Sequence, residues 1–178
     1  MEYVNLAARI LVGAVFAVAA VAKALDLGGF ARSLRTLVPE FGRFSAAGAV
    51  GVVAAEAGIA LALAIPGTAS SVSALWLALL FDAAFWLVLL RALRRHTEDA
   101  ACRCFGQWSS ESLSSTQFGR NAALAAACAA GLLATPPAHA AFHAQGLMIA
   151  VFCGVVGAVL VICADDLVDL VRPRPLPA

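Results

Sequence analysis

The composition of this chain separates it from soluble domains. Its 178 residues are 62% hydrophobic and 13% charged, with a mean hydropathy of +0.91, whereas soluble domains carry about 45–50% apolar and about 25% charged residues. The net charge is only +1 and no basic stripe is present, so we expect no nucleic-acid partner. Five cysteines are an odd number and do not form the even framework of a secreted disulfide scaffold.

Five apolar segments predict an all-α polytopic membrane bundle over residues 1–168, with a four-helix core and a fifth transmembrane helix. A bilayer crossing by a helix needs about 20 apolar residues, and the predicted spans are residues 5–25, 46–65, 71–90, 120–135 and 147–164. We expect the first span to be retained, because the start of the chain lacks the positive charge of a signal peptide. The proline-rich tail at residues 169–178 is expected to be disordered.

The segment between the first two spans has a pattern of its own. Phe30, Leu34 and Leu37 recur at helical spacing, with arginines on other faces. This pattern predicts a short helix along the membrane surface that ends before Pro39. In the second span, Gly48, Gly51, Ala55 and Gly58 have the spacing that lets helices approach closely.

Two acidic residues fall at similar depth inside predicted spans, Glu56 in the second and Asp82 in the third. A carboxylate facing lipid is costly, so both should face the bundle interior, protonated or hydrogen-bonded. Two interpretations stay open: a proton relay or polar site, and simple hydrogen bonding between helices. Lys23 ends the first span, where its ammonium is expected to reach back to the membrane interface.

The polar loop between the third and fourth spans contains Cys102-Arg103-Cys104-Phe105-Gly106. Two cysteines one residue apart can form a disulfide if the backbone turns there, and the glycine permits such a turn. Arg103 would stabilise a thiolate and so raise reactivity. The motif therefore predicts a reactive pair, Cys102 and Cys104, with Arg103 between them. The alternative is a pair of reduced cysteines without a role.

The other three cysteines differ in depth. Cys128 and Cys153 lie within predicted spans, where free cysteine packs as a small hydrophobe. Cys163 ends the fifth span on the same face as the cysteine loop, so it is either a resolving thiol or a packing residue.

Charge bias predicts the side of the membrane on which the loop lies. Eleven of the twelve Lys and Arg residues lie on or near the face of the long loops. The positive-inside rule then places the Cys102–Cys104 loop in the cytoplasm.

The chain resembles the MauE/DoxX-type redox-associated membrane proteins over about residues 5–135. The resemblance is carried by Val12-Gly13-Ala14-Val15-Phe16, Ala22-Lys23, Phe30, Glu56, the Cys-x-Cys-Phe-Gly element and Arg120-Asn121. The family pattern has glycine between the cysteines, where this chain has Arg103. The resemblance implies a multi-pass protein of the bacterial inner membrane that takes part in thiol/disulfide exchange with a thioredoxin-like partner. It also implies a link to maturing a disulfide-rich dehydrogenase outside the cytoplasm, which favours an extracytoplasmic loop.

The sequence thus favours a membrane component of a thiol-disulfide oxidoreductase system. Cys102, Cys104 and Arg103 are its reactive residues, and Glu56, Lys23, Cys163 and Asp82 support them. No cofactor motif is visible, and a quinone stays an open alternative as the electron acceptor. One alternative is a soft-metal protein that binds or transports copper, zinc or mercury through the thiolates, with Cys128 and Cys153 as further ligands. The other is a structural assembly factor whose cysteines have no role.

Overall fold

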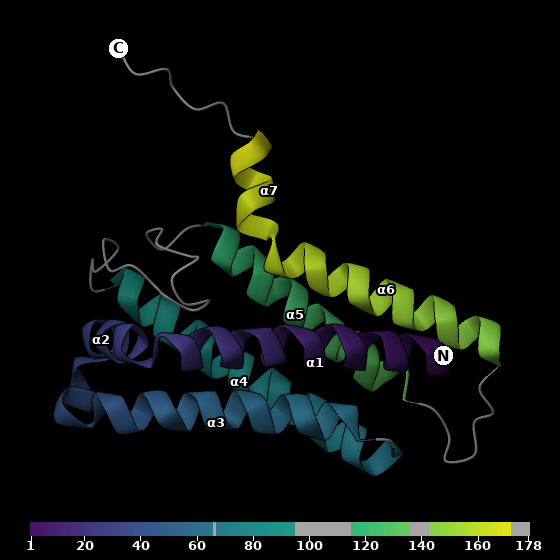
Figure 1. The fold of residues 1–178 in the computed structure, drawn as a ribbon, viewed down its shortest axis with the longest axis horizontal. Coiled ribbons are helices and arrows are strands. Elements are labelled where there is room, and N and C mark those ends of the chain that lie inside the picture. The colour runs from purple at the N-terminus through teal and green to yellow at the C-terminus, as the bar shows by residue number, and fades with distance from the viewer. Residues whose placement is uncertain (66, 95–114, 136–142, 172–178) are drawn as a thin grey trace.

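The computed structural model describes residues 1–65, 67–94, 115–135 and 143–171 (Figure 1). The loop that contains Cys102, Arg103 and Cys104 lies outside the described residues, as does the end of the proline-rich tail. The described residues contain no strand, and the predicted all-α class is confirmed. The elements in chain order are α1 (Glu2–Leu25), α2 (Leu27–Leu37), the 3-10 helix η1 (Pro39–Phe44), α3 (Ser45–Ala64), α4 (Thr68–Arg94), α5 (Ser115–Leu133), α6 (Ala144–Ile162) and α7 (Ala164–Val171).

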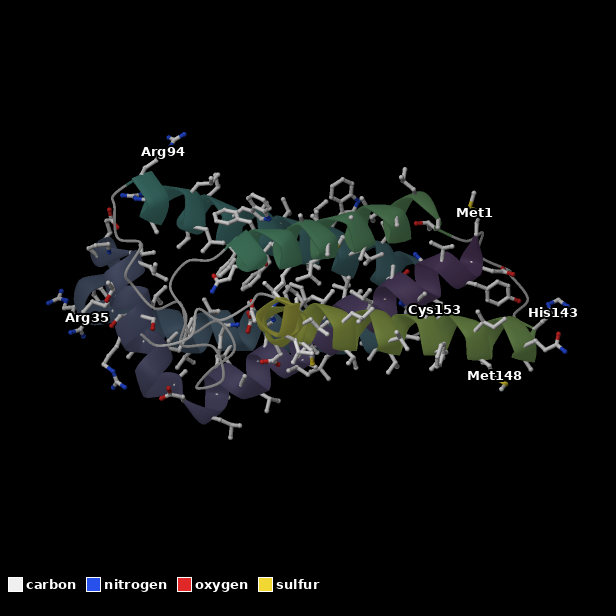
Figure 2. The ribbon with its side chains drawn as sticks, turned by 90° about the horizontal axis from the view of Figure 1, so that it is seen from above. Met1, Arg35, Arg94, His143, Met148 and Cys153 are labelled. Atoms are coloured by element: carbon white, nitrogen blue, oxygen red, sulfur yellow. The ribbon has the colours of Figure 1, made fainter. Side chains whose placement is uncertain are left out.

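The five long helices of the described residues form a bundle in which α1 packs against α3, α5 and α6. Figure 1 shows α1 running between α3 and α6, and α2 closing one end of the bundle. Arg35 and Arg94 lie at this same end, whereas Met1 and His143 lie at the opposite end (Figure 2). We call the first of these the loop end, because α4 finishes there and α5 begins there.

Four of the described helical segments are long and apolar enough to cross a membrane: Glu2–Leu25, Gly42–Ala64, Ser70–Ala92 and Ala144–Ile162. This arrangement supports the predicted multi-pass membrane protein. The predicted span at residues 120–135 falls in α5, which is not among the four. This helix begins at Ser115 rather than at residue 120, and its first turns carry polar residues that include Gln117 and Arg120. It nevertheless packs within the bundle, against α1 and α4.

The short helix predicted before Pro39 is present as α2. The Asp26 side chain caps its start by accepting a hydrogen bond from the backbone N–H of Gly29, at 3.0 Å. Phe30 and Leu37 are buried, and Arg35 points outward at the loop end (Figure 2). This amphipathic helix therefore closes one end of the bundle with its apolar face inward.

Glycine sets the distance between α1 and α6. A Cβ atom on Gly154 would lie 2.8 Å from the Ile10 Cβ and 2.9 Å from the Ala7 carbonyl oxygen, so only glycine fits without a shift. The small residues predicted to bring α3 close to another helix behave differently. A Cβ on Gly51 or Gly58 would meet no described atom within 4 Å. These two glycines face outward, and the close contact is made on α6 instead.

Two polar side chains, the half-buried Arg9 and the buried Asn5, fix α1 against its neighbours near the opposite end. Arg9 donates through Nη2 to the carbonyl oxygens of Leu63 and Ile65, at 2.8 and 2.7 Å, and so satisfies the last carbonyls of α3. Asn5 donates through Nδ2 to the carbonyl oxygen of Gly131, at 2.7 Å. These contacts fix the positions of α3 and α5 along α1, and with them the residues that meet at the loop end.

Candidate functional site: a polar cavity near the loop end

A cavity of about 60 Å³ lies among α1, α3, α4, α5 and α6. Its walls are apolar except for five polar side chains: Lys23, Glu56, Asp82, Arg120 and Asn121. One water needs about 10–15 Å³ by this kind of measure, so the cavity has room for several waters or a very small ligand. An apolar cavity with a few convergent polar groups is the usual composition of a small-molecule site.

Lys23 and Glu56 form an ion pair beside the cavity. The Lys23 Nζ lies 2.6 Å from the Glu56 Oε1, and the two side chains are only 4% and 6% exposed. The expectation that the Lys23 ammonium reaches the membrane interface is therefore wrong. Side chains on a helix lean toward its N-terminus, which for α1 is away from the loop end, so the Lys23 chain can run back into the bundle. The expected inward position of Glu56 is confirmed, and its second oxygen, Oε2, is buried with no hydrogen bond to a described residue.

Asp82 enters the cavity from α4. It is 5% exposed, and the part of the chain that the structure describes offers its carboxyl neither a hydrogen bond nor an ion pair. The expected inward position of this residue is confirmed as well. Unlike the Glu56 carboxyl, the Asp82 carboxyl is not paired with any described cation.

Arg120 joins the cavity to α7. Its Nη1 donates to the Asp165 Oδ2 at 2.5 Å, and the Arg120 side chain is 7% exposed. The sequence did not predict α7, nor did it identify Arg120 or its neighbour Asn121 as site residues. The signals for Arg120 and Asn121 were their place in the family resemblance and a polar pair in an alanine-rich helix. The Asn121 Nδ2 is buried without a hydrogen-bond partner among the described residues.

The cavity lies close to the helix ends that lead into the cysteine loop. Arg120 is five residues after Ser115, about 8 Å at the rise of 1.5 Å per residue. Lys23 is in the last turn of α1, at the same end. Three of the predicted supporting residues, Lys23, Glu56 and Asp82, therefore line the same cavity. The predicted reactive residues remain a prediction, because they lie outside the described part of the chain.

None of the three described cysteines lines this cavity. Cys128 is fully buried in the apolar core with Val12 and Leu75, which agrees with a packing role. Cys153 is exposed on α6, so the expectation that it packs inside the bundle is wrong. Cys163 is half-buried at the C-terminal cap of α6. Among the residues with described positions, no group of three or more His, Cys, Asp and Glu side chains is arranged to hold a metal ion.

Comparison with known proteins identifies the family. The family model of the methylamine utilisation protein MauE matches residues 1–134, which include all five polar residues of the cavity and the Cys-x-Cys loop. No curated protein and no solved structure matches the chain. The match extends over more than half of the 178 residues, and the chain therefore belongs to the MauE family of methylamine utilisation proteins.

Proposed function

We propose that this protein is a membrane thiol-disulfide exchange protein, in which Cys102 and Cys104 exchange disulfides with a thioredoxin-like partner. The observation that best supports this proposal is the convergence of buried polar residues near the loop end, close to the helix that follows the Cys-x-Cys loop. Family membership adds a methylamine-utilisation context. Burying charged side chains inside a membrane bundle costs free energy, so four of them around one cavity favour a functional role.

The chemistry needs one attacking thiolate and one resolving thiol. The thiolate attacks a sulfur of the partner's disulfide, a chain-to-partner S–S bond forms, and the partner's departing sulfur takes the electron pair and a proton. The second cysteine then displaces the partner, so that the chain is oxidised to a disulfide and the partner is reduced to a dithiol. The reverse sequence reduces the chain. Arg103 favours the thiolate form of its neighbours. The Lys23–Glu56 and Arg120–Asp165 pairs hold described helices together at the loop end.

A soft-metal protein is the second candidate. Paired thiolates bind copper(I), zinc and mercury, but a transport path would need further soft ligands in the bundle. Cys128 is sealed in the core and Cys153 faces outward, so these two do not extend such a path. A structural assembly factor with unreactive cysteines is the third candidate.

Thiol titration of the purified protein, combined with metal analysis of the same sample, separates the three candidates. For the exchange protein we expect two more reactive thiols after reduction than after mild oxidation, and no stoichiometric metal. The same number of thiols in both states, together with bound copper or zinc, would favour the metal protein. An equal number of thiols without metal would favour the assembly factor.

The side of the membrane on which the loop lies is a separate prediction. The charge bias predicts that a membrane-impermeant maleimide leaves Cys102 and Cys104 unmodified in intact cells, because the loop is cytoplasmic. The reporter chain carries Cys128→Ala, Cys153→Ser and Cys163→Ser, so that only the loop thiols can react. Permeabilised cells provide the control for reactivity. Ready labelling from outside would contradict the charge argument and favour the extracytoplasmic position implied by the family.

A further inference from the structure

The helix α7 lies beyond the part of the chain that the MauE model matches, which ends at residue 134. It follows α6 after a single residue, Cys163, and α6 is one of the four described segments apolar enough to cross a membrane. Figure 1 shows that α7 turns sharply away from the direction of α6. A helix that begins where a span ends and turns across that span runs along the bilayer surface.

One side of α7 is attached to the bundle. The Arg120 Nη1 of α5 donates to the Asp165 Oδ2 at 2.5 Å, and the Asp165 side chain is 31% exposed. Val168 is half-buried as well. At 3.6 residues per turn it lies only roughly 60° from Asp165 around the helix axis. These two residues mark the side of α7 that faces α5 and α6.

Two leucines occupy the other side of α7. Leu167 is 46% exposed and Leu170 is 87% exposed. They are three residues apart and therefore neighbours on the helix surface, at roughly 200° and 140° from Asp165. Exposed apolar side chains also extend along α6 as far as Leu160, and on a membrane-spanning helix such side chains face lipid. The leucines of α7 continue this apolar surface past Cys163.

The size of α7 favours lipid as the partner of its leucines. The helix has eight residues, and isolated helices shorter than about 12–15 residues are only marginally stable in water. It therefore depends on contacts on more than one side. A stable protein interface buries about 800 Å² on each partner, far more than two leucines supply. A lipid surface needs only an apolar face with a polar edge, and the exposed Asp166 beside the leucines supplies that edge.

We propose that α7 is an interfacial membrane anchor, in which Leu167 and Leu170 insert at the boundary between the lipid headgroups and the acyl chains. Asp166 stays at the level of the headgroups and water. The anchor keeps Asp165 against Arg120, and so it fixes the first turns of α5, the helix that follows the Cys-x-Cys loop. It does not depend on thiol exchange.

Spin labels on the full chain in nanodiscs of phosphatidylcholine and phosphatidylglycerol test this anchor. Labels are placed by Leu167→Cys or Leu170→Cys in a chain whose five native cysteines are replaced. We expect both labels to collide more often with molecular oxygen, which concentrates in lipid, than with a water-soluble nickel chelate. Phe152→Cys, at a position 69% exposed on α6, is the lipid reference. Arg32→Cys, at an exposed position on α2, is the water reference.

Two outcomes of the labelling would overturn the proposal. Labels at 167 and 170 that meet the chelate as often as the Arg32→Cys label would show that the leucines lie in water. Immobile labels reached by neither reagent would show that protein, either a partner or a second copy, covers them.

Amide hydrogen exchange tests the same anchor without a label. Leu167→Ser combined with Leu170→Ser should speed exchange in α7 at least about tenfold, because a helix this short opens once its apolar contact is lost. Asp166→Asn is the matched control: it keeps both leucines and should exchange as wild type does. Unchanged exchange in the double variant would contradict the anchor.

Discussion

Lys23→Met should destabilise the protein by about 3–5 kcal/mol, the usual cost of removing one partner from a buried ion pair. The variant leaves the Glu56 carboxylate in an apolar interior without its counter-ion, because the two groups are 2.6 Å apart and nearly inaccessible. The free energy of unfolding, measured by denaturant titration in mixed micelles, checks this expectation.

Two further variants make the test specific. Lys23→Met combined with Glu56→Leu should recover most of the lost stability, because a buried pair replaced by apolar residues of similar volume is often neutral. Arg91→Met is the control. It breaks the ion pair between Arg91 and Glu40, in which both side chains are 50% exposed. Exposed ion pairs contribute only about 0–1 kcal/mol to stability. If Lys23→Met cost no more stability than Arg91→Met, the buried Lys23–Glu56 pair would not contribute to the stability of the bundle.

Single substitutions of the loop cysteines should have different consequences. Without the resolving cysteine, a mixed disulfide with the partner should accumulate, because nothing nearby can release it. Without the attacking cysteine, no adduct should form. We expect Cys104 to be the resolving thiol, so that Cys104→Ser traps the partner and Cys102→Ser does not. Non-reducing gel electrophoresis after rapid acid quenching measures the adduct.

The double variant, Cys102→Ser with Cys104→Ser, should trap nothing and should lose the exchange activity. Cys153→Ser is a suitable control, because Cys153 is exposed on α6 away from the cavity lining. Wild-type activity in both single variants and in the double variant, with no adduct in any of them, would rule out a redox role for the loop.

The sequence predicted the helical membrane bundle correctly because its signals are local. Each long apolar run specifies a helix, and the phenylalanine and leucine spacing before Pro39 specifies α2. The inward position of Glu56 and Asp82 was predictable too, since the cost of facing lipid applies to any bundle arrangement.

Pairings between helices could not be predicted in the same way. Lys23 and Glu56 are 33 residues apart in the chain, and a lysine at the end of a span can either reach the interface or turn inward. The neighbouring helix decides between these outcomes. Arg120 and Asp165 are 45 residues apart, and their contact depends on α7, a short helix without a strong signal. The glycines of α3 show the same limit, because a pattern on one helix does not determine which face its neighbours cover.

The proposed exchange function requires Cys102 and Cys104 to form one redox couple, and a redox titration measures whether they do. The chain with Cys128→Ala, Cys153→Ser and Cys163→Ser is equilibrated in glutathione buffers of increasing oxidising power. Its free thiols are then alkylated and counted by peptide mass spectrometry. The proposed exchange function predicts that Cys102 and Cys104 lose their labels together, in a single two-electron transition that gives one intramolecular disulfide. Two cysteines that stay fully labelled throughout, or that acquire glutathione separately without joining each other, would contradict it.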